Sequence, residues 1–250
     1  MTSVINTVLA VGATGSMGQV VVPELLSRGV RVRALVRDEV RAQALLPASV
    51  EYVVGDMATG DGLVEAVRGV DAIVFTHGGE VKEVDYDGVR RLLEVLDGAT
   101  PRISLMTSID VARATTAYNG LLNWKRRAER LVRAYGAPYT IVRPGWFEYQ
   151  RPSENAVLME QGDSTPVHVQ RGVARSQIAK TLVSALFSDT AIGKTFELFA
   201  QEGELQSDWD ELFGALELDD QNELAGGGDH GVALADEPAE VLADIAKLRG

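Results

Sequence analysis

The stretch VLAVGATGSMG, from Val8 to Gly18, decides the fold predicted for this chain. An apolar run typical of a buried strand leads directly into Gly12, Gly15 and Gly18, and a helix-like segment follows. Gly12 permits a tight bend, Gly15 lets backbone amides approach a pyrophosphate, and Gly18 lets the helix pack closely on the strand. The N-terminus of such a helix favours phosphate because its amides are unpaired and its dipole is positive there. The sequence therefore predicts a dinucleotide-binding turn made by Gly12, Ala13, Thr14, Gly15, Ser16, Met17 and Gly18.

Length and composition limit the classes of protein that fit. At 250 residues the chain suits one domain with a full core, and its few aromatic residues are typical of parallel strands packed against helices. The net charge of −12 argues against nucleic acid and against anionic membranes as partners. The sequence has no cysteine, no signal stretch and no apolar run of membrane-spanning length, so we expect a cytoplasmic protein without disulfides. We predict no metal site.

Short apolar runs alternate with segments of helical period over the first 142 residues. The predicted strands are Val8–Val11, Val30–Val36, Glu51–Val54, Ala72–Phe75, Ile103–Met106 and Tyr139–Val142. The predicted helices are Ser16–Arg28, Val40–Leu45, Gly62–Val67, Tyr86–Leu96 and Trp124–Ala134. This alternation predicts an α/β fold of the Rossmann type, a doubly wound parallel sheet with helices on both faces. We expect one domain over residues 1–250, in which 146–250 add a small C-terminal substrate-side cap, a last strand and further helices.

The last hundred residues are less regular. We expect a helix at Ser176–Phe187, a strand at Thr195–Phe199 and a terminal helix that ends near Leu248. The acidic segment Glu202–Asp220 has apolar residues at helical spacing, among them Leu205, Trp209 and Phe213, and is predicted to be a helix with a solvated face. The run Gly226–Gly228 predicts a flexible break.

Strand two ends in Arg37 and Asp38, at the distance from the glycines where a ribose partner is expected. A guanidinium there suits the 2′-phosphate of NADP through its charge and its forked donors, so we expect NADP(H) rather than NAD(H). Asp38 can instead accept bonds from a ribose 2′-hydroxyl, and both side chains can also be solvated surface groups.

Strands three and four end in residues that suit the adenosine half of a dinucleotide. Asp56 can accept a bond from the adenine amino group and Met57 can pack on the ring, although an aspartate at this place can also cap a helix. Thr76, His77 and Gly78 would let the backbone pass along the adenine ribose. His77 is either an acid in the pocket or a polar lining residue.

Strands five and six complete a set of motifs that resembles a known family. The motifs are GATGSMG, RALVRD, GDM, the segment Tyr86–Val89, Ser108 after strand five, NWKRRAERLVR and TIVRPGWF. In this order they resemble the atypical short-chain dehydrogenases/reductases of the NmrA-like, NAD(P)H-binding kind, over roughly Val8 to Phe199. Enzymes of that superfamily usually use a serine, a tyrosine and a lysine, with the last two spaced YxxxK. In those enzymes the tyrosine exchanges a proton with the substrate oxygen.

The resemblance implies a catalytic set that is incomplete in this chain. Ser108 and Lys125 align with the serine and the lysine, so Lys125 is expected to hold the nicotinamide ribose and Ser108 to orient the substrate or the carboxamide. The tyrosine position is Leu121, which cannot donate a proton. Tyr118 lies roughly one helical turn earlier and can substitute only if the helix begins early or its loop folds inward.

Residues after strand six are candidates for the far end of the site. We expect Pro144 and Gly145 to contact the cofactor. The expected substrate-pocket residues are His77, Tyr118, Trp146 and Phe147. The two aromatic residues after Gly145 can equally form a seam between the cap and the sheet. Arg126 and Arg127, next to Lys125, are predicted to lie on a solvated helix face.

Two classes of function stay open at this point. The first is an NADPH-dependent oxidoreductase that transfers hydride to a small conjugated carbonyl or quinone-like acceptor of unknown identity, since nicotinamide carries the redox chemistry itself. The second is a non-catalytic NADP(H)-binding redox sensor, which Leu121 favours. A sugar-nucleotide epimerase or dehydratase is a weaker alternative, because such reactions usually depend on the missing tyrosine. We expect a monomer, or a homodimer in which the helices Tyr86–Leu96 and Trp124–Ala134 pair.

Overall fold

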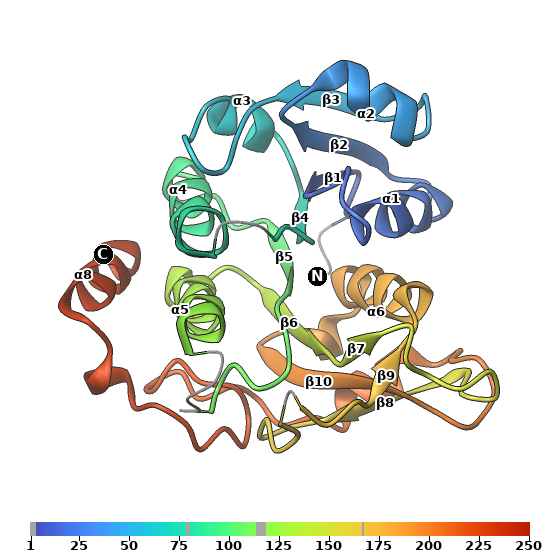
Figure 1. Cartoon of the computed structure of the whole chain (residues 1–250). Coiled ribbons are helices and arrows are strands. Elements are labelled where there is room, and N and C mark those ends of the chain that lie inside the picture. The colour runs from blue at the N-terminus through green and yellow to red at the C-terminus, as the bar shows by residue number, and fades with distance from the viewer. Residues whose placement is uncertain (1–3, 79–80, 114–118, 167) are drawn as a thin grey trace.

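The computed structural model describes residues 4–78, 81–113, 119–166 and 168–250. An eight-stranded sheet in the order β3-β2-β1-β4-β5-β6-β10-β8 lies at its centre (Figure 1). Its strands are β1 Thr7–Val11, β2 Arg31–Val36, β3 Glu51–Val54, β4 Ala72–Phe75, β5 Arg102–Met106, β6 Tyr139–Pro144, β8 Ala156–Glu160 and β10 Lys194–Gln201. Within the described sheet every pairing is parallel except that of β8 with β10.

The strand order reverses once, between β1 and β4. The chain first builds outward from β1 to β3 and then returns to the other side of β1 to build β4, β5 and β6. Loops that leave β1 and β4 therefore part in opposite directions, which opens a crevice at the carboxyl ends of these strands. The predicted doubly wound parallel sheet is confirmed.

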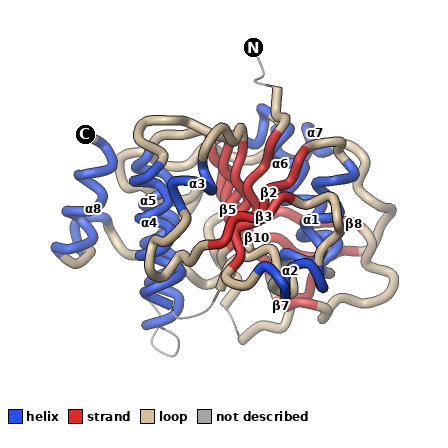
Figure 2. The backbone as a smooth tube through the Cα atoms, turned by 90° about the horizontal axis from the view of Figure 1, so that it is seen from above, coloured by secondary structure: helices blue, strands red, loops and turns tan. Residues whose placement is uncertain are grey.

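Helices cover both faces of the sheet (Figure 2). One face carries α1 Gly18–Ser27, α2 Glu39–Leu45, α6 Arg175–Phe187 and α7 Trp209–Gly214. The other carries α3 Leu63–Val67, α4 Asp87–Val95, α5 Asn119–Tyr135 and α8 Ala239–Arg249. Successive residues of a strand point to opposite faces, so Val8 packs under the first group of helices and Leu9 under the second. Because both faces are covered, β1 and β4 are buried along their whole length.

Several short elements were not expected from the sequence. Strands β7 (Trp146–Phe147) and β9 (Gly172–Val173) pair with each other in a second, two-stranded sheet. A π-helix, η1 (Val81–Tyr86), leads into α4. The single-turn 3-10 helices are η2 Asp189–Ala191 and η3 Leu234–Asp236. No helix in the described part of the chain combines the length and the apolar character needed to cross a membrane.

The acidic segment differs from its prediction. Only α7 is helical there, and it begins after Asp208, whose carboxylate accepts the Glu211 amide. Phe213 is fully buried, but Leu205 is 62 % exposed, so the longer amphipathic helix is wrong. The flexible break at Gly226–Gly228 is also wrong, because Gly226 is buried and its amide donates to the Asp229 carboxylate.

Candidate cofactor site

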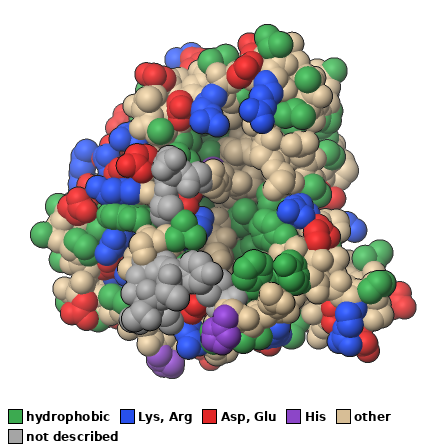
Figure 3. All heavy atoms as spheres, viewed as in Figure 1, with side chains coloured by type: hydrophobic (Ala, Val, Ile, Leu, Met, Phe, Trp, Pro, Cys, Tyr) green, Lys and Arg blue, Asp and Glu red, His purple; other side chains and the backbone are tan. Residues whose placement is uncertain are grey.

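A groove of about 450 Å³ lies at the carboxyl ends of β1 to β4. Figure 3 shows a hollow in the middle of this face, with basic side chains above it and an apolar patch below. The groove is lined by Val11, Gly12, Thr14, Gly15, Leu35, Val36, Arg37, Asp38, Arg41, Gly55, Asp56, Met57, Thr76, His77, Gly78 and Val84. The fold thus brings together residues predicted separately after four different strands.

The glycine turn is packed too closely against neighbouring backbone to hold a side chain at two of its glycines. Gly12 has a φ of 81°, and a Cβ on it would lie 2.6 Å from the backbone nitrogen of His77. A Cβ on Gly18 would lie 2.3 Å from the Gly12 oxygen. Helix α1 begins here without a side-chain cap, since Met17 makes no capping hydrogen bond. The Gln19, Val20 and Val21 amides at the start of α1 already donate to the Gly15 and Met17 carbonyls, so a pyrophosphate would lie against the glycine turn that precedes them.

Residues of the predicted turn point in two directions. Thr14 and Gly15 line the groove, and Ser16 is exposed beside them. Ala13 and Met17 are buried in the core under α1, so only their backbone can face a cofactor. The turn combines a ligand-facing side with a packing side.

Two arginines border the groove at the end of β2. Arg37 and Arg41 are both exposed and both line it. Asp38 lies between them and serves as the N-cap of α2, because its Oδ1 accepts the Arg41 amide at 3.0 Å. Arg33 points elsewhere, with its Nε 2.8 Å from Glu51 Oε1. Sequence reasoning missed Arg41, although it lies one helical turn beyond Arg37.

Polar side chains after β3 and β4 make hydrogen bonds to the protein's own backbone. Asp56 Oδ1 accepts the Ala58 amide at 2.8 Å, which agrees with a turn-capping role for this oxygen. Met57 is almost buried and lines the groove. The Thr76 hydroxyl donates to the Val11 carbonyl at 3.1 Å and so ties β4 to β1. These contacts fix the floor on which a base or ribose could lie.

A buried charged cluster lies behind His77. Lys125 Nζ, on α5, is 2.8 Å from Asp85 Oδ2, on η1. His77 Nε2 is 3.8 Å from Asp85 Oδ1, and both of these side chains are less than one-tenth exposed. Burial is the main reason that the pKa of His77 falls to about 4, so its imidazole is neutral near pH 7. Sequence reasoning missed Asp85, because only the fold brings η1 against α5.

A second, smaller pocket continues the site toward β6. It has a volume of about 290 Å³ and is lined by Ser108, Ile109, Pro144, Gly145, Trp146 and Phe147. The Ser108 hydroxyl donates to the Ile109 carbonyl at 3.1 Å. Trp146 lies beside Tyr149, with ring centroids 5.6 Å apart. Pro144 and Gly145, predicted for the cofactor, and Trp146 and Phe147, predicted for the substrate, therefore share one pocket with Ser108.

The tyrosine position has no hydroxyl. Leu121 is 42 % exposed near the start of α5. Tyr118, the predicted substitute, lies outside the residues that the structure describes. Its assignment to catalysis and to the substrate pocket stays a prediction, as do the roles of the other site residues.

The solvated face predicted for Arg126 and Arg127 is wrong. Arg126 Nε is 3.0 Å and Arg127 Nε 2.8 Å from the Glu237 carboxylate, and Arg130 Nη1 is 2.9 Å from it. The Glu237 side chain is fully buried. Glu237 is more than a hundred residues away in the sequence, so no local pattern could reveal this pairing.

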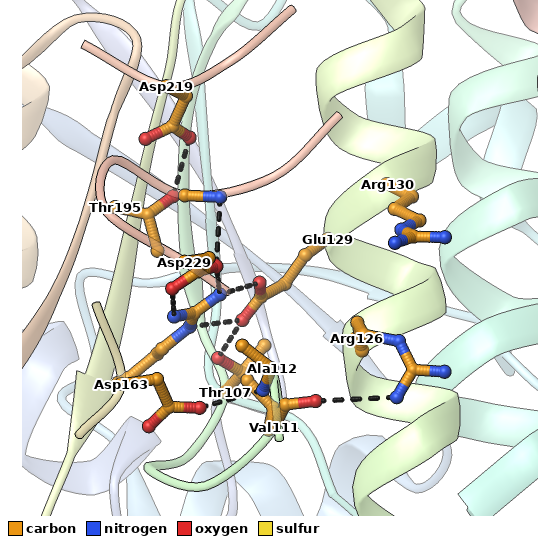
Figure 4. Close-up of polar contacts among 12 residues, drawn as sticks. Thr107, Val111, Ala112, Arg126, Glu129, Arg130, Asp163, Thr195, Asp219 and Asp229 are labelled. Carbon is orange, nitrogen blue, oxygen red and sulfur yellow. Dashed lines mark hydrogen bonds and ion pairs between the residues drawn. The ribbon is translucent and has the colours of Figure 1, made fainter. Parts of the chain in front are cut away.

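Arg143, in the TIVRPGWF motif, makes a network of buried ion pairs. Its guanidinium donates to Glu129 at 2.7 Å, to Glu197 at 3.1 Å and to Asp229 at 2.8 Å. Figure 4 shows Thr107 beside Glu129, and the Thr107 hydroxyl donates to the Glu129 carboxylate at 2.6 Å. The network joins α5, β6, β10 and the C-terminal segment behind the second pocket.

Comparisons with known proteins agree with this geometry. A family model described as NAD(P)H-binding matches residues 12–189. Protein TIC 62, chloroplastic, of Pisum sativum is 30 % identical over 182 residues, which is 60 % of this chain. The matched part is 34 % of the pea protein, so the chain spans about a third of that relative. The uncharacterized sugar epimerase YhfK of Bacillus subtilis is 29 % identical over 209 residues, covering 76 % of this chain and 92 % of YhfK.

Solved structures share the fold. A putative NAD-dependent epimerase/dehydratase from Bacillus halodurans has a TM-score of 0.70 at 23 % identity and covers 84 % of this chain and 100 % of its own. ChuY, an anaerobillin reductase from Escherichia coli O157:H7, has a TM-score of 0.66 at 20 % identity, with 81 % of this chain and 100 % of ChuY covered. The family match includes the glycine turn after β1 and the five strands β2, β3, β4, β5 and β6. The chain therefore belongs to the NAD(P)H-binding family.

Proposed function

We propose that this protein is an NADP(H)-dependent reductase that transfers hydride to a small conjugated carbonyl or quinone-like acceptor. The proposal depends on two adjoining features, a groove with a glycine-rich phosphate cradle and an apolar pocket beyond it. The nicotinamide, when bound, supplies the hydride. The chain's own residues bind, orient and shield the reactants.

The arrangement at the end of β2 is the observation that favours NADP(H). Arg37 and Arg41 offer two guanidinium groups at the groove, and these match a phosphate in charge and in donor geometry. Asp38 is the carboxylate that would otherwise favour a ribose 2′-hydroxyl. One of its oxygens already caps α2, which reduces its availability to NAD(H).

The second pocket supports an acceptor that is flat and apolar. Trp146 and Phe147 offer aromatic surface, and the Ser108 hydroxyl is the polar group that would orient the acceptor or the carboxamide. Lys125 would hold the nicotinamide ribose. Leu121 cannot supply a proton, so we favour a conjugated acceptor whose reduced form takes its proton from solvent.

Calorimetric titration of the protein with NADPH, NADP⁺ and NADH tests the first half of the proposal. We expect NADPH to bind more tightly than NADH. NADPH oxidation, followed at 340 nm with quinones, flavins, aldehydes and an anaerobillin, then tests the second half. The anaerobillin is included because ChuY, which shares the fold, is a reductase of that name. Absence of binding by every nucleotide would contradict the whole proposal.

Substitution of Arg37 tests the choice of cofactor. Arg37→Asp should weaken NADPH binding by roughly 10- to 100-fold, the value of a charge-assisted bond to phosphate, and should change NADH binding much less. Arg41→Ala should act in the same direction. Arg68→Asp makes the same change of charge on an arginine that is 69 % exposed and pairs with Glu65, so it serves as the matched control. Equal losses for NADPH and NADH in Arg37→Asp would rule out the assignment.

Leu121 favours one second candidate, a non-catalytic NADP(H)-binding redox sensor. Such a protein would keep the cradle and the arginines but would need no proton donor. It predicts tight binding that distinguishes NADP⁺ from NADPH and no oxidation with any acceptor. The titration and the oxidation assay together separate the two candidates.

A further inference from the structure

The ion pair between Asp85 and Lys125 is largely shielded from solvent. The Asp85 side chain is 4 % exposed and that of Lys125 is 16 % exposed. Asp85 Oδ1 and His77 Nδ1 are buried and have no hydrogen-bond partner among the described residues. Burying charged and polar groups in this way costs stability that apolar side chains would not cost. A structural role alone gives no reason for this cost.

The pair also lies at the edge of the cofactor groove. His77 lines the groove, and Asp85 is directly behind it at 3.8 Å. Val84, the residue before Asp85, lines the groove as well. Lys125 reaches the same place from α5, and it is the residue proposed to hold the nicotinamide ribose. Among the described residues, Asp85, Lys125 and His77 are titratable groups that meet here, from η1, from α5 and from the loop after β4.

The two forms of the cofactor differ in charge at one end only. The nicotinamide ring carries a positive charge in NADP⁺ and none in NADPH, whereas the phosphates and the adenosine are the same in both. A fixed charge near the ring therefore changes the ratio of the two affinities, while contacts to the rest of the cofactor cancel from that ratio. Lys125 alone would repel the oxidised ring, and the carboxylate of Asp85 offsets this repulsion.

We propose that the Asp85–Lys125 ion pair sets the relative affinity of the protein for NADP⁺ and NADPH. The inference rests on the proposed binding of NADP(H) but not on turnover. Asp85 makes the pair neutral overall, so the oxidised cofactor is retained rather than expelled. His77 adds no charge to this balance near neutral pH, because burial keeps its imidazole unprotonated.

Opposite single substitutions test the proposal. The measured quantity is the ratio of the dissociation constants for NADP⁺ and NADPH, from calorimetry at pH 7. Asp85→Asn leaves the ammonium unbalanced and should raise the ratio by roughly ten-fold, since a unit charge within about 8 Å acts strongly in a medium of effective dielectric constant about 20. Lys125→Met leaves the carboxylate unbalanced and should lower the ratio. The double variant removes both charges and should return the ratio to within about two-fold of the wild-type value.

A matched control and a folding check complete the design. Glu83→Gln makes the same change of charge on the exposed side of η1 and should leave the ratio unchanged. Thermal melts establish that each variant is folded; if Asp85→Asn does not fold, Lys125→Met and the double variant carry the same comparison. A ratio that moves in the same direction in both single variants, or by less than two-fold in both, overturns the proposal. If the wild-type protein binds neither form, the proposed function itself has failed, which is a different result.

Discussion

Arg143 carries a buried charge in β6. Its side chain is 1 % exposed and pairs with three carboxylates, those of Glu129, Glu197 and Asp229. Arg143→Met should lower the free energy of unfolding by about 3–5 kcal/mol, because it leaves Glu197 and Asp229 buried without this partner and Glu129 paired with Arg133 alone. Urea unfolding measures the loss. Arg151→Met, at an arginine that is 71 % exposed, should change stability by less than about 0.5 kcal/mol. A loss below 1 kcal/mol for Arg143→Met would mean that the network reorganises without cost.

Residues of the site differ in how far their roles could be predicted. Gly12 and Arg37 occupy positions that a strand followed by a turn defines locally, so the sequence indicates them. Asp85 and Glu237 meet their partners only through tertiary structure, across 40 residues for Lys125 and 111 for Arg126. A charged residue on a helix is read as solvated unless the segment that covers it is known, and this is why the prediction for Arg126 was wrong.

At the scale of elements, α8 provides a test of how the C-terminal segment is held. It packs on the α4 and α5 side of the sheet through Val241 and Ile245, which are 0 % and 4 % exposed. The Tyr86 hydroxyl, at the end of η1, donates to Asp244 at 2.8 Å. Ile245→Ala should weaken the docking of α8 by about 2 kcal/mol or more, since it removes buried methyl groups.

Hydrogen exchange measures this effect, because α8 should open more often than the sheet does. Amides of α8 should exchange at least about ten-fold faster in Ile245→Ala, while those of β1 and β4 should be little changed. Glu240→Ala, at an exposed position of the same helix, is the control. Uniform acceleration over the whole protein would instead mean that α8 and the sheet unfold as one unit.

Elements with a strong continuous pattern were predicted well. β1, β4, β5 and β6 are buried on both faces, so their apolar runs show them within one or two residues. β7 and β9 have two residues each, too few for any periodicity. β8 is an edge strand and only partly buried, and its apolar run Ala156–Met159 lies outside the regular alternation of strands and helices on which the other predictions depended.

At the scale of the whole molecule, stability should depend on pH through the buried carboxyl groups. Burial raises the pKa of Glu197 from 4.5 to about 8. The folded state then binds more protons than the unfolded state between these values, so this contribution is complete below about pH 4.5 and is lost as the pH rises toward 8. Glu129 and Asp229 have lowered pKa values, because Arg143 offsets their burial, and they contribute stability that is lost on acidification.

The wild-type protein should therefore become less stable from pH 6 to pH 8.5, with Tm falling over this range. Glu197→Gln keeps a neutral group at this place at every pH, so its Tm should fall much less over the same range. Thermal melts at constant ionic strength measure the two slopes. Equal slopes would show that Glu197 is ionised in the folded protein throughout, and would contradict the direction of its pKa shift.

Glu237 links the C-terminal segment to α5 through ion pairs. It lies beyond the residues that the family model matches, and it is held by Arg126, Arg127 and Arg130 on the helix that also carries Lys125. If the proposed cofactor binds at Lys125, release of the tail and binding of the cofactor are linked equilibria that share one helix. A ligand that steadies this helix makes the tail harder to release. By reciprocity, a partner that bound the released tail would weaken the binding of the ligand by the same factor.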